Sequence, residues 1–270
     1  MGASLAVVDA RPYANALANT LKGGGFEDAH DIPGGGTVYF ANIPNIHEMR
    51  KSLQRLRRAC EKNDSDFLEE VHASRWLDHL RLLLAASTFV ARLLHVRKTP
   101  TLVHCSDGWD RTSQLSALAQ LLLDPFYRTL DGFPRLVEKD WCAFGYQFAK
   151  RRDPATDDHS PIFLQFLDAA FQVLDQRPDA FEFTEAFLLN VRDAAASQWH
   201  STFRGDTDAS RAAEPRRVPA WPALVAAPTA RNPNFAPEPG VLFLKVDYSA
   251  QAVRLWRACH VGPPTRAPAA

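Results

Sequence analysis

A short apolar run, a polar loop and an apolar helix-like stretch follow one another near the middle of the chain. Thr101 to His104 has the length and apolar character of a buried strand, and Thr112 to Leu123 forms an apolar stretch that stops before Pro125. The residues between them, Cys105 to Arg111, are small, polar or charged apart from one tryptophan. This strand–loop–helix unit predicts an α/β domain in which the loop faces the N-terminus of the following helix.

The same alternation marks much of the remaining chain. Two more apolar runs predict strands, and four amphipathic or apolar stretches predict helices. The predicted strands are 4–9 and 37–40, and the helices are 45–56, 74–96, 161–175 and 184–199. Asn45 and Glu48 have the spacing of a capping box at a helix start. We therefore expect a central sheet flanked by helices.

Composition and charge exclude several functional classes. Lys and Arg number 31, as do Asp and Glu, so global charge gives no case for nucleic acid or non-specific membrane binding. The four cysteines form no CxxC pair, which excludes a zinc or disulfide framework and suits a reducing compartment. The chain shows no signal peptide and no run long enough to span a bilayer. We expect a cytosolic protein without metal or cofactor.

The C-terminal quarter differs in composition. Residues 204–240 are rich in Ala, Pro, Arg and Asp without a period, which predicts a flexible insertion. Residues 241–246 resemble a strand and 250–259 a closing helix, and the Pro-rich tail 263–270 should be disordered. We therefore expect a catalytic core over 1–203, the insertion, a closing strand and helix within 241–262, and the tail.

The loop carries the chemistry. Five residues separate Cys105 from Arg111, a spacing that lets successive backbone N–H groups curl around one tetrahedral anion in front of a helix N-terminus. Such surroundings favour the thiolate that nucleophilic attack requires. Arg111 can clamp two phosphate oxygens. We predict a cysteine-dependent phosphatase with a phosphocysteine intermediate.

A leaving alkoxide needs a proton, and two carboxyl groups lie inside the loop. Asp107 or Asp110 can serve as general acid and later as the base that activates water. Thr112 is placed to hydrogen-bond the sulfur. Cys60, Cys142 and Cys259 lack such a setting and are interpreted as structural.

The run HCSDGWDRT, 104–112, resembles the active-site signature of the myotubularin phosphoinositide 3-phosphatases. Other tyrosine phosphatases share the Cys-x5-Arg spacing but not the loop interior. Further segments resemble the family in the same order, and they are 9–12, 18–25, 45–50, 76–77, 126–129, 137–139, 160–166 and 180–183.

The resemblance implies the myotubularin type of cysteine-dependent phosphatase fold. It implies hydrolysis of the D3 phosphate of phosphatidylinositol 3-phosphate and of phosphatidylinositol 3,5-bisphosphate, without metal or cofactor. It also implies peripheral contact with phosphoinositide-bearing endosomal membranes and homo- or hetero-oligomers with family members. The family carries a PH-like domain and the opening of the catalytic domain before the matched region, so this chain is expected to be truncated at its N-terminus.

The resemblance also assigns residues. The phosphate-binding loop would comprise Ser106, Asp107, Gly108, Trp109, Asp110 and Arg111, with Cys105 as nucleophile and Asp110 matching the acid best. The substrate pocket would include Asn19, Asn45, Ile46 and Arg151. The family has a second basic residue near the inositol 5-position, where this chain has Gln147, and this weakens the case for the bisphosphate.

Two alternatives remain at this point. The same chemistry could act on phosphoproteins, although the Asp-containing loop interior argues against it. The second alternative is a non-catalytic scaffold that binds phosphoinositide. Because the chain retains Cys105, Asp110 and Arg111, activity is favoured over a scaffold role.

Overall fold

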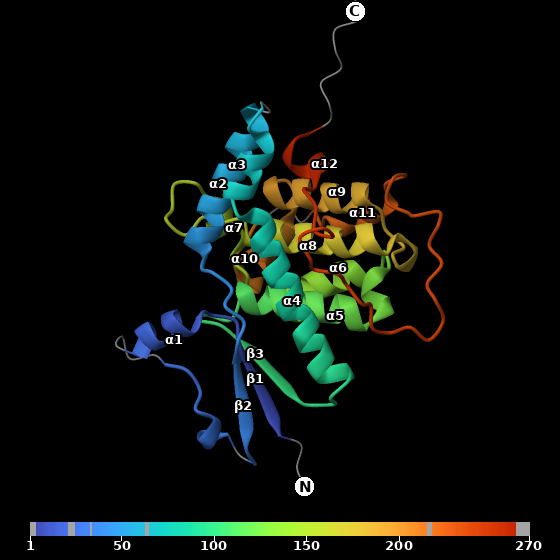
Figure 1. The fold of residues 1–270 in the computed structure, drawn as a ribbon. Helices are drawn as coiled ribbons and strands as arrows, with labels where there is room; N and C mark the ends of the chain where they lie inside the picture. The colour runs from blue at the N-terminus through green and yellow to red at the C-terminus, as the bar shows by residue number, and fades with distance from the viewer. Residues whose placement is uncertain (1–3, 21–24, 33, 63–64, 215–217, 263–270) are drawn as a thin grey trace, which may run out of the picture.

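The computed structural model describes residues 4–20, 25–32, 34–62, 65–214 and 218–262. It shows an α/β fold in which a small parallel sheet forms one end of the molecule and helices with their connecting loops make up the rest (Figure 1). The α/β class expected from the sequence is confirmed. No helix of the described ranges is long and apolar enough to cross a membrane.

The sheet has three strands in the order β2-β1-β3, and all of them are parallel. They span Leu5–Asp9 (β1), Gly36–Phe40 (β2) and Thr101–His104 (β3). Asp9 pairs in register with Phe40 on one side and His104 on the other, so the three carboxyl ends lie at one edge. In α/β sheets this edge is where ligands bind.

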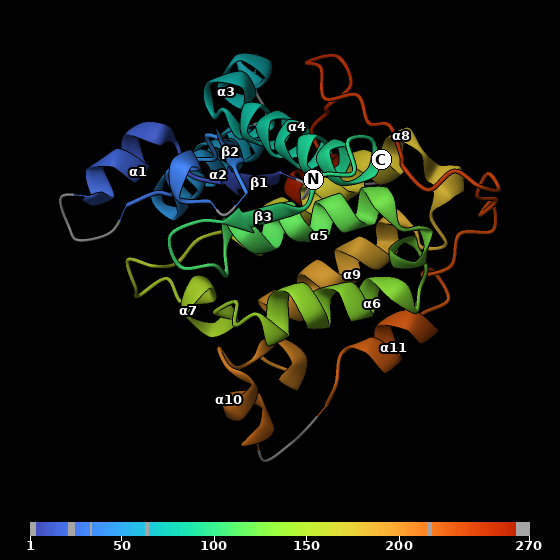
Figure 2. The same ribbon diagram turned by 90° about the horizontal axis from the view of Figure 1, so that it is seen from below.

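The first four helices are α1 (Tyr13–Thr20), α2 (Ile46–Lys62), α3 (Phe67–Ala73) and α4 (Trp76–His95). Helices α2 and α4 rise from the sheet, and α5 (Arg111–Leu123) packs along α4 (Figures 1 and 2). Ten of the twenty residues of α4 are buried, because its apolar residues repeat at helical spacing. The long helix expected over 74–96 is confirmed to within two residues.

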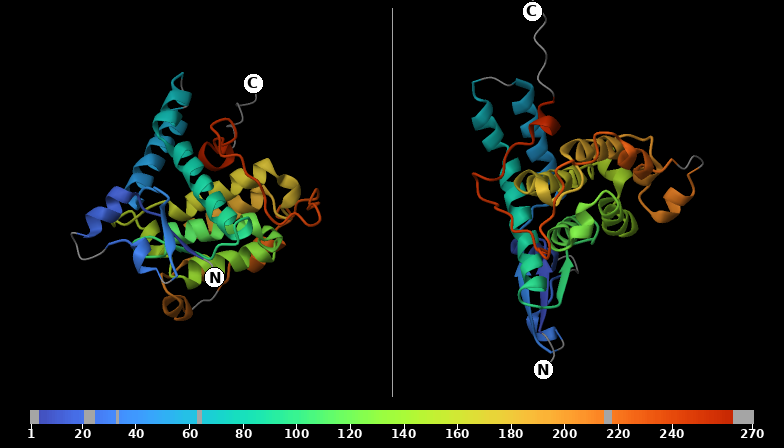
Figure 3. Two further views of the ribbon diagram at one scale, coloured as in Figure 1. Left: turned by 60° about the horizontal axis from the view of Figure 1, so that its bottom comes forward. Right: turned by 90° about the vertical axis from the view of Figure 1, so that its right-hand side faces the viewer.

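The later helices gather on one side of the sheet and of the α2–α4 pair (Figure 3). They are α6 (Gly132–Val137), a π-helical turn at Glu138–Ala143, α7 (Phe148–Arg152), α8 (Ile162–Gln176) and α9 (Glu185–Ala196). Short 3-10 turns lie at Ala29–Asp31, Pro125–Arg128, Pro178–Ala180 and Ser201–Phe203. An aromatic cluster fills the space between α6 and α8, with Trp141 at 4.9 Å from both the Phe163 and Phe166 rings. This cluster packs the π-helical turn against α8.

The C-terminal quarter departs from expectation. Residues 204–240, predicted to be a flexible insertion, contain α10 (Asp208–Ala212) and α11 (Trp221–Ala226). Ala220 and Ala230 are fully buried, so packing orders a stretch whose composition showed no period.

The prediction of a strand over 241–246 was wrong. That segment pairs with no strand in the described structure, although Leu244 is buried and its N–H donates to the Leu122 carbonyl. Its apolar residues indicate burial, which does not by itself supply a strand partner. The helix expected over 250–259 is shortened to α12 (Arg257–His260). The tail 263–270 lies outside the described residues, and the domain boundaries remain predictions.

Candidate active site

The loop between β3 and α5 lies at the edge where the parallel strands end. Cys105 follows the last residue of β3, and Arg111 is the first residue of α5. The strand, the loop and the helix expected from the sequence are therefore confirmed. The first-turn N–H groups of α5 point back toward the loop, where an anion is stabilised by the helix dipole.

The sulfur of Cys105 accepts a hydrogen bond from inside the loop. The Gly108 N–H donates to Sγ over 3.3 Å, and the cysteine is only 8% exposed. Gly108 has φ +90°, a left-handed backbone that glycine adopts without strain. Apart from the adjoining residues of the chain, no atom lies within 4 Å of the position where a Cβ would stand, so backbone conformation is the reason for glycine.

The guanidinium of Arg111 is held in place from two directions. Its Nη2 donates to Ser106 Oγ at 3.1 Å, and its Nη1 donates to the Ile43 carbonyl at 3.3 Å. Arg111 is itself 9% exposed. These contacts use part of the guanidinium's donors, so others can bind an anion seated in the loop.

Asp110 and Arg151 form a buried, two-pronged ion pair. Arg151 Nε donates to Asp110 Oδ1 at 2.9 Å, and Nη2 donates to Oδ2 at 2.6 Å. Burial opposes the charge of Arg151, but the hydrogen bonds and charge of Asp110 outweigh it and raise the pKa of Arg151. Tyr146 is buried beside the pair, and burial followed by the charge of Asp110 raises the pKa of its hydroxyl.

A second charged cluster underlies the loop. Asp9, at the end of β1, is fully buried and accepts three hydrogen bonds from the guanidinium of Arg11. His104 Nε2 lies 2.9 Å from Glu27 and 4.0 Å from Asp9. The pKa of Arg11 is raised, chiefly by its hydrogen bonds to Asp9. Sequence reasoning gave Asp9 and Arg11 no role, although two charges directly after an apolar strand were a usable signal.

The remaining predicted residues differ in their surroundings. Asp107 is exposed on the loop, and Trp109 is partly buried with its indole N–H unpaired in the described structure. Thr112 Oγ1 is also without a hydrogen-bond partner there, so the contact to the sulfur comes from the Gly108 backbone.

Asn45 and Ile46 stand at the start of α2. Asn45 Oδ1 accepts from the N–H groups of His47 and Glu48, both at 3.1 Å, and this confirms its interpretation as a helix cap. Glu48 does not complete the capping box, because its carboxylate accepts from Lys51. Asn19 belongs to α1, but its side chain lies outside the described part of the chain. The substrate-binding roles of these residues remain predictions.

The other three cysteines have different surroundings. Burial raises the pKa of the Cys60 and Cys142 thiols and raises that of Cys259 to about 12. Such thiols stay protonated at neutral pH and are poor nucleophiles. Among the described residues, no group of three or more His, Cys, Asp or Glu side chains is arranged to hold a metal ion.

Known proteins resemble this chain over most of its length. A family model described as "Myotubularin-like phosphatase domain" matches residues 2–212. The chain is 43% identical over 241 residues to human phosphatidylinositol-3,5-bisphosphate 3-phosphatase MTMR8, covering 85% of this chain and 34% of that protein. It is 39% identical over 270 residues to the Caenorhabditis elegans MTMR6 enzyme of the same description, covering 95% and 40%.

The chain is also 44% identical over 206 residues to Xenopus laevis myotubularin, covering 74% of this chain and 34% of that protein. It therefore spans between about a third and two fifths of the length of these relatives. The resemblance seen in the loop extends over most of the sequence, and the chain belongs to the myotubularin-like phosphatase family.

Proposed function

We propose that this chain carries the active site of a phosphoinositide 3-phosphatase. The observation that carries the proposal is the loop from Cys105 to Arg111, in which the sulfur and the guanidinium are both buried and hydrogen-bonded in place. The relatives named as 3-phosphatases of phosphatidylinositol 3,5-bisphosphate support the substrate class. The proposed substrate is phosphatidylinositol 3-phosphate, with the 3,5-bisphosphate as a second substrate.

The chemistry would proceed in two displacements. The Cys105 thiolate attacks phosphorus, an S–P bond forms, and the P–O bond to the inositol ring breaks as the leaving oxygen takes a proton. Water then attacks phosphorus, the S–P bond breaks, and inorganic phosphate leaves as the thiolate is restored. Arg111 and the loop N–H groups stabilise the phosphoryl oxygens in both steps.

Asp110 and Asp107 remain the candidates for the proton transfers. Asp110 is buried and bound by Arg151 through both oxygens, whereas Asp107 is exposed. The residue that gives its proton to the leaving oxygen is left as the carboxylate that takes a proton from the attacking water, and this returns it to its starting state. The family resemblance favours Asp110 for this role, and the exposed Asp107 is the alternative. These assignments of acid and base are part of the proposal.

The proposed location is the surface of endosomal membranes, reached peripherally, and it rests on the family resemblance. Homo- or hetero-oligomers with other family members are proposed on the same family basis.

The test is phosphate release from short-chain phosphatidylinositol 3-phosphate and 3,5-bisphosphate, with the 4- and 5-phosphate isomers and a phosphotyrosine peptide alongside. We expect turnover of the two 3-phosphorylated lipids only, abolished by Cys105→Ser. Turnover of the peptide without the lipids would replace the proposal with a protein phosphatase. Binding of the lipids without turnover, by a chain that melts cooperatively, would indicate a scaffold.

A further inference from the structure

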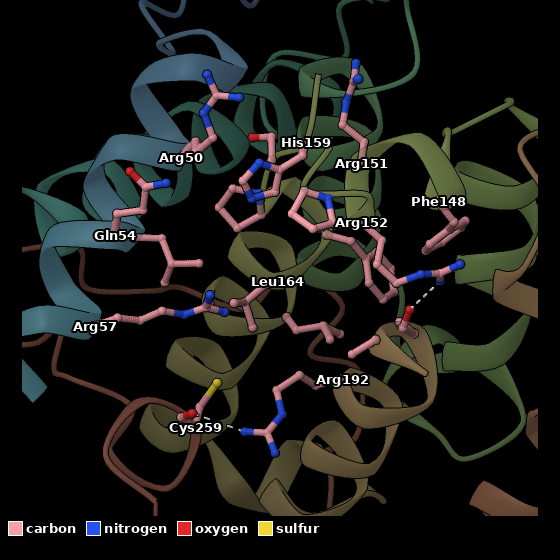
Figure 4. Close-up of a pocket in the computed structure, with 18 of the residues that line it drawn as sticks. Arg50, Gln54, Arg57, Phe148, Arg151, Arg152, His159, Leu164, Arg192 and Cys259 are labelled. Carbon is pink, nitrogen blue, oxygen red and sulfur yellow. Dashed lines mark hydrogen bonds between the residues drawn. The ribbon is translucent and has the colours of Figure 1, made fainter. Parts of the chain in front are cut away.

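A cavity lies beside Arg151 and apart from the loop between β3 and α5. It has a volume of about 580 Å³, and it is lined by residues of α2, α7, α8, α9, the end of α12 and the segment between α7 and α8. None of the residues from Cys105 to Arg111 lines it. Arg151 is shared, but its guanidinium binds Asp110, and Figure 4 shows it pointing away from Arg57 and Arg192.

The lining of this cavity is strongly cationic. Five arginines line it and no carboxylate does, within the part of the chain that the structure describes. These arginines are Arg50, Arg57, Arg151, Arg152 and Arg192. Opposite charges normally accompany such a cluster, because like charges in a partly enclosed site repel one another. The cluster therefore has the composition of a site for an anion.

Three of the arginines have no carboxylate partner among the described residues. Arg50 donates to the Asp157 carbonyl, and Arg152 donates to the carbonyls of Ala195 and Phe203. Arg57 has no hydrogen bond or ion pair there, and it extends from α2 across the cavity toward Leu164 (Figure 4). The pKa of His159, between them, is lowered by burial and then by the charges of Arg50 and Arg57.

Part of the remaining lining is apolar. Leu53 on α2 faces Phe163, Leu164 and Leu167 of α8, with Phe148 of α7 beside them. The volume falls in the range of small-molecule sites and far exceeds the space of one phosphate ion. A ligand that matches both the arginine side chains and the apolar side chains combines an acidic group with an apolar part.

We propose that this cavity binds an amphiphilic organic anion, whose acidic group pairs with Arg57 and its neighbouring arginines while its apolar part covers the leucine and phenylalanine side chains. The site is distinct from the catalytic loop, and the proposal is independent of the proposed phosphatase activity.

The experiment is isothermal titration of the full chain with three probes: octanoate, octanamide, which lacks the charge, and acetate, which lacks the chain. Octanoate should bind at least about tenfold more tightly than either control, since a charge-assisted contact and burial of the chain each contribute.

Arg57→Gln and Arg58→Gln form a matched pair, because both residues are exposed on α2 and only Arg57 lines the cavity. Arg57→Gln should weaken octanoate binding roughly tenfold, and Arg58→Gln should leave it unchanged, with melting temperatures equal in both. Equal affinities for octanoate and octanamide, equal effects of the two substitutions, or no binding of octanoate would each overturn the proposal.

Discussion

Arg151 grips both carboxylate oxygens of Asp110 across 41 residues of sequence, and both side chains are buried. The pair ties α7 to the loop between β3 and α5. A buried ion pair contributes little over an apolar pair of the same shape, but removing one partner leaves an uncompensated charge. Removing one partner of the Asp110–Arg151 pair should therefore cost more stability than the intact pair contributes.

We expect Arg151→Met to lower the free energy of unfolding by about 3–5 kcal/mol, because Asp110 would be left buried and unpaired. Replacing both partners, with Asp110→Asn and Arg151→Met together, should recover part of this loss. Urea denaturation of the variants measures it. Lys150→Met is the matched control, since Lys150 forms an exposed ion pair with Asp158 and should cost less than about 1 kcal/mol. Equal losses in the two methionine variants would contradict the prediction.

Alkylation should distinguish the four cysteines by their surroundings. Iodoacetamide reacts with thiolates, and burial raises the pKa of Cys60, Cys142 and Cys259, so these thiols stay protonated at pH 7. Reaction at Cys105 should therefore be fastest at this pH. Peptide mass spectrometry over a time course measures the four rates.

The other cysteines should become reactive toward iodoacetamide only when the pH approaches the raised pKa of each thiol. For Cys259 this pKa is about 12. Inorganic phosphate should slow the labelling of Cys105 alone by occupying the loop. Labelling of Cys259 at pH 7 as rapidly as Cys105 would show that burial does not control these thiols.

Asn45 offers a direct separation of two roles. As the cap of α2 it accepts two backbone N–H groups, so Asn45→Ala should lower the free energy of unfolding by about 1 kcal/mol. Asn45→Ser keeps a capping oxygen and should retain most of the stability. Thermal or urea unfolding measures this. If Asn45 also binds substrate, Asn45→Ser will raise KM while stability is kept, and an unchanged KM would leave capping as its role.

Local pattern predicted the strand, loop and helix around Cys105, because an apolar run, polar loop and apolar run fix that order without distant partners. Local pattern failed in two other places. Glu48 had the spacing for a capping box, but Lys51 lies one helical turn away and takes its carboxylate. Residues 204–240 had no period, yet burial of Ala220 and Ala230 orders them.

The same limit applies to the site. The Cys-x5-Arg spacing pointed to the loop from sequence alone, whereas the Asp110–Arg151 and His104–Glu27 pairs arise from tertiary contacts. Sequence spacing contains no information on which distant charge a loop carboxylate will meet. The cavity beside Arg151 was missed for that reason, since its arginines come from three separate helices.

Asp168 is the clearest example of a contact that sequence spacing does not predict. Its carboxylate, in an apolar helix, binds one neighbouring side chain and two that are distant in sequence. It is fully buried in α8, where Oδ2 accepts from Trp76 Nε1 and lies 2.8 Å from His260 Nε2, while Oδ1 accepts from Gln172 Nε2. It thereby links α4 and α12 to α8.

We expect Asp168→Ala to lower the free energy of unfolding by about 3 kcal/mol or more, since buried donors would lose their acceptor. Asp175→Ala is the control on the same helix, where the carboxylate pairs with Arg254 near the surface, and it should cost less than about 1 kcal/mol. Urea denaturation compares the two variants, and amide hydrogen exchange should show α12 opening before the core in Asp168→Ala only. Similar unfolding midpoints and equal protection of α12 in both variants would mean that apolar packing of Trp256 and its neighbours, not the carboxylate, holds the C-terminal segment in place.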